Sequence, residues 1–290
     1  MGTNINFSKK LGRIYGTSIN LQIATCTDPD STAFLLATGI TDPVISAAIC
    51  NLVVGLKADG LWSKMKAIYP FVGGTATTHK FNLKNPLDTN AAYRLVFTGG
   101  WTHSATGAKP NGINAFANTF LTPTVDLNYA SAGYYSRTNT VENGTGDANG
   151  IVLGVRSDNN STVNNTFQLK IKTNPSNFND FFYSRTGSAT NNVGRVVDAD
   201  GRGFFVGTLD ATNAKIYKNG VNLTTTAFSF NRNTPNRPIY LGSLNNKGVS
   251  SEYSLKESAF AHIGDALTNV EVANLNIRVQ AFEVALSRNV

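Results

Sequence analysis

The hydrophobic positions of the chain first repeat with a helical period in the run TDPVISAAICNLVVGLKADG. Its apolar residues recur at spacings of four, three and four along one helix face: Ile45, Ile49, Leu52 and Leu56. Asp42 precedes this run as an N-cap, and Pro43 stands at the first helical position, where a missing N–H has no cost. Because so apolar a stripe does not face water alone, we expect it to bury against the rest of the chain or against another subunit as an oligomer or docking surface.

Three further segments carry helical signals. The run DPDSTAFLLATG begins with capping residues and ends at Gly39. The run LWSKMKAIYPF predicts a short helix that ends before Pro70. Near the end of the chain, Thr268 and Glu271 have the spacing of a capping box. An apolar stripe follows it: Leu275, Val279, Phe282 and Leu286.

Between Val72 and about Gly264 the pattern changes to short alternating runs separated by Gly, Asn, Asp and Ser. The sequence AKIYKNGVNL places Asn219-Gly220 between two such runs, which predicts a β-hairpin with a tight turn that serves as scaffold. Many short strands at this spacing predict a mainly β, two-sheet sandwich or jelly roll. We therefore divide the chain into an extended arm (1–29), a helical docking segment (30–71), a jelly roll (72–266) and a C-terminal helix packed on it (267–290).

Composition narrows the class of protein. The chain of 290 residues is 41% hydrophobic and only 15% charged, which suits a packed core under a neutral polar surface. Its net charge is +7, but the basic residues are scattered, so we expect no nucleic-acid partner. No apolar run approaches the length of a membrane span, and no apolar region of a signal peptide follows Met1. We therefore expect no membrane partner and synthesis in the cytoplasm.

Two cysteines, Cys26 and Cys50, lie in the first fifth of the chain. Two cysteines in a chain of this length do not form a disulfide framework, although a disulfide between them remains open. Cys50 lies on the predicted helix, and we interpret it as a small buried apolar residue.

Three runs near the C-terminus resemble the closing strands of a concanavalin A-like, or laminin G-like, jelly roll: GFFVGTLDATNAKIYKNGVNL, RPIYLGSLNNKG and SAFAHIGDALTNVEVANL. The resemblance covers about residues 75 to 275. The helical run before it resembles a segment that precedes such jelly rolls in structural proteins of tailed bacteriophages. The resemblance implies a virion protein exposed on capsid, neck or tail as a decoration or fibre-like component, with copies of itself and other virion proteins as partners.

Concanavalin A-like folds also include glycoside hydrolases, which need two carboxylates across a cleft. The strand signature Glu-x-Asp-x-x-Glu is absent, and the chain has five glutamates: Glu142, Glu252, Glu257, Glu271 and Glu283. On one strand, Glu252 and Glu257 would point to opposite faces. We therefore expect no catalytic residues and no enzyme activity. A polysaccharide-degrading enzyme that uses Glu142 or Glu252 is the least favoured alternative.

A glycan-binding role has one sequence candidate. Lectin sites combine an aromatic platform with amide and backbone groups that bind hydroxyls. The Gly-rich segment FTGGWTHSATG carries Trp101 and His103, and Asn111 and Asn114 follow it. These four residues form the predicted carbohydrate site. A host-glycan adhesin as the main role is the first alternative to a purely structural protein.

A calcium site is the one cofactor that the sequence suggests. Asp198 and Asp200 in DADGRG have the spacing of the first half of a calcium loop, but the second half is missing. A polar turn between strands is the favoured interpretation. The histidines do not have metal-ligand spacing, so no other cofactor is expected.

Overall fold

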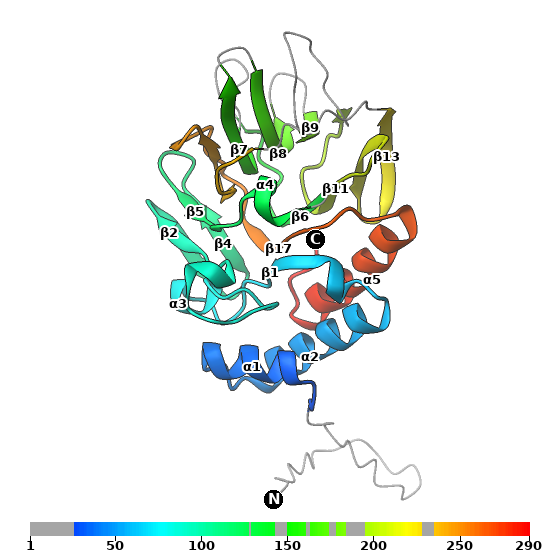
Figure 1. The fold of residues 1–290 in the computed structure, drawn as a ribbon. Helices are drawn as coiled ribbons and strands as arrows, with labels where there is room; N and C mark the ends of the chain where they lie inside the picture. Colours follow the sequence, from blue (N-terminus) through cyan, green and yellow to red (C-terminus); the bar gives the residue numbers. More distant parts are fainter. Residues whose placement is uncertain are drawn as a thin grey trace, which may run out of the picture.

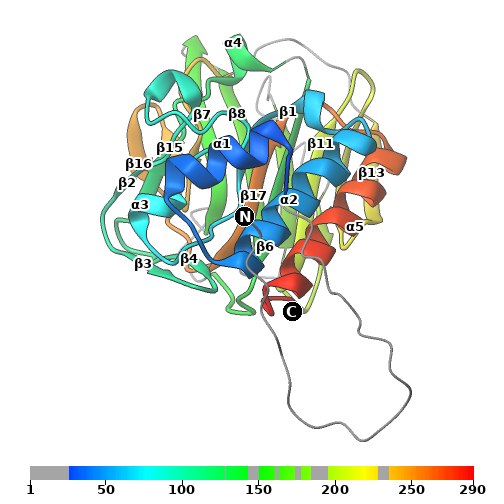
Figure 2. The same cartoon turned by 90° about the horizontal axis from the view of Figure 1, so that it is seen from below.

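The computed structural model describes residues 26–127, 129–142, 150–160, 163–173, 178–183, 195–227 and 235–290. Within them the protein has three layers: helices, a central β-sheet and an outer β-sheet (Figures 1 and 2). The predicted two-sheet sandwich with a C-terminal helix is confirmed. Most of the predicted arm, residues 1–25, lies outside the described residues.

Eight strands form the central sheet in the described part of the chain. In spatial order they are β13 (Val221–Ala227), β12 (Asn213–Lys218), β11 (Gly203–Leu209), β6 (Ala130–Ser136), β17 (Ser258–Gly264), β4 (Gly107–Pro110) and β3 (Trp101–Ser104), with β1 (Met65–Tyr69) also paired to β17. All these pairs are antiparallel, as expected for a jelly-roll sandwich.

Nine strands form the outer sheet, counted over the same residues. In spatial order they are β10 (Val196–Val197), β9 (Phe178–Tyr183), β8 (Val163–Thr173), β7 (Ile151–Asn160), β14 (Tyr240–Leu241), β5 (Phe116–Asn118) and β2 (Val96–Thr98). The hairpin of β15 (Leu244–Asn246) and β16 (Val249–Ser251) joins this sheet beside β7.

The central sheet is buried on both faces. On β6, Tyr134 packs into the core between the two sheets, whereas Tyr135 packs into a second core beneath the helices. On β11, Phe205 and Phe204 divide between the two cores in the same way. This double burial explains why these strands are apolar at consecutive positions instead of alternating with polar residues.

Three helices cover the far side of the central sheet and lie side by side in Figure 2: α1 (Pro29–Thr38), α2 (Pro43–Ala58) and α5 (Asn269–Ala285). The predicted caps are confirmed, because Asp42 accepts the backbone N–H groups of Val44 and Ile45, and Thr268 forms the capping box with Glu271. The short helices are α3 (Ala76–His79), α4 (Pro123–Asp126), η1 (Trp62–Lys64) and η2 (Asn90–Ala92). None of the described helices is long and apolar enough to cross a membrane.

The apolar stripe of α2 packs inside the chain. Ile49, Leu52 and Leu56 are almost fully buried in the core between the helices and the central sheet, and Ile45 packs at its margin. The sequence allowed two surfaces to cover this stripe, the rest of the chain or another subunit. In the structure the chain's own central sheet covers it. The docking role assigned to these four residues is therefore corrected: they hold the helix layer on the sandwich.

The segment predicted as a short helix before Pro70 differs from the prediction. Only η1 is helical, and Met65–Tyr69 forms β1 beside β17. Ala67 and Tyr69 face the core between the sheets, whereas Ile68 faces the helices. A strand that is buried on both faces does not alternate between apolar and polar residues, so its sequence pattern cannot be told from that of a buried helix. The sheet therefore begins at Met65, before the predicted boundary at residue 72.

Cys26 and Cys50 form a disulfide, with their Cα atoms 5.8 Å apart. It connects the residues just before α1 to the middle of α2. Of the two possibilities that the sequence left open, the disulfide is therefore the one found, and the interpretation of Cys50 as a small buried apolar residue is corrected.

The predicted Asn219-Gly220 hairpin is confirmed as the turn between β12 and β13. Both residues have positive φ angles, 49° and 78°. The Asn219 side chain accepts the Phe204 N–H at 2.9 Å and the Gln280 amide at 3.2 Å. Since Gln280 belongs to α5, the turn joins the sheet to the helix layer, which is a scaffold role.

Candidate functional site

Trp101, the predicted sugar platform, closes one edge of the sandwich. Its indole Nε1 donates to the carbonyls of Thr98 (3.1 Å) and Phe116 (3.2 Å). The ring packs edge-on against Phe97 and lies so close to Gly242 that a Cβ there would come within 2.8 Å of it. The indole is thus rigidly held and half-buried, with its hydrogen-bond donor already used.

The two asparagines predicted to bind sugar hydroxyls mainly hold their own loop. Asn111 Oδ1 accepts the backbone N–H groups of Ile113, Asn114 and Ala115 at 2.9 to 3.2 Å. Asn114 Oδ1 accepts from Gly100 N and from Asn111 Nδ2. Both side-chain oxygens are therefore used in hydrogen bonds within the loop. Only N–H groups of the side-chain amides are left to donate to a ligand.

His103 lies beside Trp101 and turns toward the interior. Its Nδ1 is 2.9 Å from Nδ1 of His79, so one ring donates and the other accepts, and the accepting ring is neutral. Burial, the His103 ring and Arg288 lower the pKa of His79 to about 3. Burial also lowers the pKa of His103. The structure thus brings together the predicted residues Trp101, His103, Asn111 and Asn114. Their hydrogen-bonding groups are mostly used within the protein.

Asp198 and Asp200, the predicted calcium ligands, already face cationic side chains. Lys218 Nζ donates to Asp198 Oδ2 at 2.8 Å and to the Asp200 carbonyl at 2.6 Å. The Arg202 guanidinium pairs with the Asp200 carboxylate and lowers its pKa to about 2. Among the described residues, no group of three or more His, Cys, Asp or Glu side chains is placed to hold a metal ion.

The glutamates weighed for hydrolysis are held in separate places. Glu142 is buried and accepts from Ser254 Oγ (2.7 Å) and Leu255 N (2.9 Å), and burial raises its pKa. Glu252 follows β16 with a φ angle of 53°, and Glu257 precedes β17. They do not share a strand, so the expectation of opposite faces of one strand is corrected.

A polar cluster that the sequence did not reveal lies on the face of the outer sheet that is turned away from the core between the sheets. Val155 on β7 and Phe167 and Leu169 on β8 point into the core between the sheets, so their neighbours point outward. Direct cross-strand pairs bring the outward residues of β7, β8, β15 and β16 side by side. We call these residues, with the glutamate that follows β16, the outer-face cluster: Arg156, Gln168, Lys170, Asn246, Ser251 and Glu252.

The outer-face cluster is charged and largely withdrawn from water. Glu252 lies 3.7 Å from Arg156 Nη1 and 3.7 Å from Lys170 Nζ. Gln168 is only 4% exposed and Lys170 only 7%. Electrostatic interactions are stronger in such a setting than on an open surface, because less water screens them.

Four side-chain atoms of the outer-face cluster are buried without a hydrogen-bond partner in the described part of the chain: Arg156 Nε, Gln168 Oε1, Asn246 Oδ1 and Ser251 Oγ. A buried polar atom without a partner costs about 1–3 kcal/mol. Four of them at one place are unusual, because native proteins satisfy nearly all such groups. The cluster therefore has unused hydrogen-bonding groups, which a ligand reaches only where a neighbouring side chain moves aside.

A stacked aromatic pair lies next to this cluster. The rings of Phe116 on β5 and Tyr240 on β14 are 4.7 Å apart and nearly parallel. Tyr240 pairs directly with Gly154 of β7, which in turn pairs with Gln168 of β8. The outer sheet therefore carries apolar rings and unpartnered polar atoms on adjacent strands.

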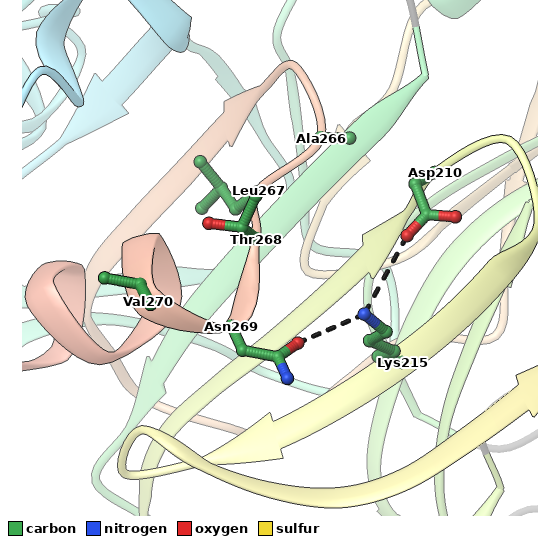
Figure 3. A pocket seen from close by; sticks show the side chains of 7 residues that line it. All are labelled: Asp210, Lys215, Ala266, Leu267, Thr268, Asn269 and Val270. Carbon is green, nitrogen blue, oxygen red and sulfur yellow. Dashed lines mark hydrogen bonds and ion pairs between the residues drawn. The ribbon is translucent and has the colours of Figure 1, made fainter.

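A hollow of about 400 Å³ lies where α5 begins (Figure 3). Its lining comes from strand β12, the loops before β12 and α5, and the first residues of α5: Asp210, Lys215, Ala266, Leu267, Thr268, Asn269 and Val270. Lys215 Nζ contacts Asn269 Oδ1 at 3.1 Å and Asp210 Oδ2 at 3.8 Å, as drawn in Figure 3. Its charged groups are paired with one another, so it is a weaker candidate than the outer-face cluster.

No family model and no curated protein matches the sequence. Similar solved structures include domain 4 of AbnA, a GH43 extracellular arabinanase from Geobacillus stearothermophilus, in complex with arabinotriose. That match has a TM-score of 0.42 and 14% identity, and it covers 73% of this chain and 98% of that one.

Two other structures are similar at the same level. A mutant Trypanosoma rangeli sialidase displaying trans-sialidase activity has a TM-score of 0.49 and 10% identity, over 81% of this chain and 39% of that one. The Ruminococcus gnavus IT-sialidase CBM40 bound to alpha2,6 sialyllactose has a TM-score of 0.35 and 16% identity, over 53% of this chain and 90% of that one. At these identities the comparisons concern the β-sandwich fold and not the activity.

Proposed function

We propose that this protein is a non-enzymatic glycan-binding component of a tailed-phage virion, and that the outer-face cluster binds the glycan. The observation that carries the binding role is the group of four buried, unpartnered polar atoms beside the Phe116–Tyr240 stack. The virion setting is supported by the resemblance of the helical run before the jelly roll to a segment of phage structural proteins.

The chemistry of the outer-face cluster suits a sugar. Arg156 Nε donates, Gln168 Oε1 accepts, and the Ser251 hydroxyl does both. A sugar ring offers hydroxyls that donate and accept at fixed spacing, together with an apolar face that packs on aromatic rings. The adjacent ring pair, Phe116 and Tyr240, provides such a surface.

The Trp101 edge is the second candidate position for the same function. Its indole is half-exposed and rigidly held by two carbonyls, so it would lose little side-chain entropy on binding. Its donor is used, however, and the neighbouring asparagine oxygens are occupied. It therefore offers a stacking surface with few hydrogen bonds.

Binding to a glycan panel and to host cells tests the binding role. We expect Gln168→Ala to weaken binding by at least about tenfold, since it removes an acceptor from the cluster. The control Thr102→Ala, at an exposed position on β3, should bind normally. Loss of binding only in Trp101→Phe would move the site to the sandwich edge. Absence of binding by the unaltered protein to any glycan would overturn the proposal.

Calcium and a chelator separate the two kinds of site. Because Asp198 and Asp200 already pair with Lys218 and Arg202, we expect glycan binding to survive the chelator. Binding that needs calcium would instead favour a metal-dependent lectin site.

The virion setting has its own test. Mass spectrometry of purified particles should find the protein, and labelled antibodies should locate it on capsid, neck or tail. Particles that lack the protein would contradict a virion role and would leave the binding role intact.

The proposal of a non-enzymatic role is supported by the positions of the acids. Glu142 is held by Ser254 and Leu255 inside the protein, and Glu252 faces two cations. We expect no release of reducing ends from any bound polysaccharide. Release that disappears in Glu252→Gln would establish the enzymatic alternative.

A further inference from the structure

Helix α1 is attached to the rest of the protein by few side chains. Of its ten residues only Ser31 and Phe34 are buried, and its main packing partner is α2. Figure 1 shows α1 at the end of the molecule that lies farthest from the outer sheet. An isolated helix of this length is marginally stable in water, so α1 depends on the contacts that hold it against α2.

The two ends of α1 are tied to α2 in different ways. At its C-terminal end a short link, residues 39–42, leads directly into α2, and Gly39 there has a left-handed φ angle of 67°. At its N-terminal end the disulfide of Cys26 ties the chain to Cys50 in the middle of α2. When the disulfide is cut, α1 stays joined to α2 through the link alone as its covalent connection.

The other contacts at the N-terminal end of α1 are ion pairs that water reaches. Lys57 Nζ on α2 lies 2.6 Å from the Asp28 carboxylate and 2.5 Å from the Asp30 carboxylate. The side chains of Lys57 and Asp30 are 31% and 40% exposed. Ion pairs in such a setting contribute little to stability. Without the disulfide, α1 is therefore held mainly by the buried ring of Phe34.

The disulfide is open to exchange with small thiols, because Cys26 and Cys50 are both half-buried. The thiolate of a small dithiol attacks one sulfur, the S–S bond breaks, and the other sulfur leaves as a thiolate that takes up a proton. The second thiol of the reductant then frees the attacked sulfur. The protein gains two thiols, and the reductant becomes a disulfide. Reducing compartments favour the thiol form and oxidising ones favour the bridge.

We propose that the Cys26–Cys50 disulfide is a redox-sensitive lock on α1. In the oxidised protein α1 lies on α2, with Phe34 in the core beneath the helices. Reduction by a dithiol lets α1 leave α2 about the link of residues 39–42, which exposes the Phe34 ring and the surface of α2 beneath it. This lock is independent of the proposed glycan site.

The remainder of the helix layer has its own attachments and stays in place on reduction. Helices α2 and α5 share the core above the central sheet. The guanidinium of Arg278 on α5 also pairs with Asp59 at the end of α2, at 2.7 Å. Release is therefore confined to α1, and α5 serves as an internal reference.

Hydrogen–deuterium exchange of the full chain, with and without dithiothreitol, tests the proposal. We expect the amides of α1 to exchange at least about tenfold faster in the reduced protein, while those of α5 keep their rates. Mass spectrometry after alkylation establishes the redox state of the cysteines in each sample. The control Cys26→Ser/Cys50→Ser should exchange in both buffers at the rate of the reduced protein.

Two results of this experiment would overturn the proposal. Equal exchange of α1 in the oxidised and the reduced protein would show that the disulfide does not hold the helix. Equal acceleration of α1 and α5 would show a loss of overall stability instead of a local release.

A second variant separates the ion pairs from the disulfide. In Lys57→Met both ion pairs to α1 are lost, and the exchange of α1 should change little while the protein is oxidised. The same variant should exchange faster than the unaltered protein once both are reduced. A large acceleration in the oxidised variant would show that the ion pairs are the lock, which also overturns the proposal.

Discussion

Glu283 and Arg288 form an ion pair in the interior of the protein, at the point where α5 ends. The guanidinium donates to the carboxylate at 2.9 and 3.0 Å and to the carbonyls of Pro70, Phe71 and Ala259. The side chains are only 0% and 2% exposed. One arginine thereby joins the end of α5 to the segment after β1 and to β17.

We expect Arg288→Met to lower the free energy of unfolding by about 3–5 kcal/mol, because it leaves the buried Glu283 carboxylate without a counter-charge. Urea denaturation measures this loss. The double variant Glu283→Gln/Arg288→Met removes both charges and should be more stable than the single variant. A double variant as unstable as the single one would show that the carbonyl contacts of Arg288 matter more than the charge.

The buried histidines make the protein sensitive to acid. Burial lowers the pKa of His262 to about 3, and burial and its neighbours lower that of His79 to the same value. Between the ordinary value of 6.5 and about 3, the unfolded chain binds protons that the folded chain does not. Stability is therefore fully present above pH 6.5 and is lost as the pH falls, by about 3 kcal/mol for each histidine at pH 4.5.

Histidine ring resonances followed by NMR provide the check. The signals of His79 and His262 should stay at their neutral positions down to pH 5, while the folded spectrum persists. Titration of either ring near pH 6.5 would show that its environment is more polar than the structure indicates.

The disulfide should stabilise the helix layer. Cys26 and Cys50 are 24 residues apart, and closing a loop of that size stabilises a folded protein by about 3 kcal/mol. We expect the double variant Cys26→Ser/Cys50→Ser to lose about that much in thermal or urea unfolding. Thiol titration of the denatured, unreduced protein should find no free thiol. Two free thiols would contradict the bridge.

Gly133 and His262 form a tightly packed pair in the central sheet. A Cβ at Gly133 would lie 2.3 Å from the His262 ring. Gly133→Ala should therefore cost about 1–3 kcal/mol through overpacking. In a His262→Ala background, which removes the ring, the same change should cost much less. Equal costs in both backgrounds would show that the two sites are not coupled.

Local signals predicted the helix ends and the hairpin well. Asp42 and Thr268 act on N–H groups within three residues of themselves, so their effect can be read from a short stretch of sequence. The Asn219-Gly220 turn depends in the same way on the φ angles of two neighbours. The strand β1 could not be recognised, because its pattern depends on burial against both cores.

The site depended on contacts that the sequence does not display. In FQLKIK the alternation already predicts that Gln168 and Lys170 share a face. What brings Asn246 and Glu252 to them is the return of a distant hairpin beside β7. For the same reason the sequence could not decide whether the two cysteines form a disulfide, since the distance between them is set by how α1 crosses α2.

The central sheet is packed between the helices and the outer sheet, so the backbone hydrogen bonds of its middle strands open less readily than those of its edge strands. Backbone amides of β6 and β17 hydrogen-bond to strands on both sides and lie beneath side chains on both faces. Exchange of these amides with solvent deuterium requires the two cores to separate together. Edge strands such as β3 can open without disturbing either core. The slowest amides should therefore form a stripe through the middle of the molecule.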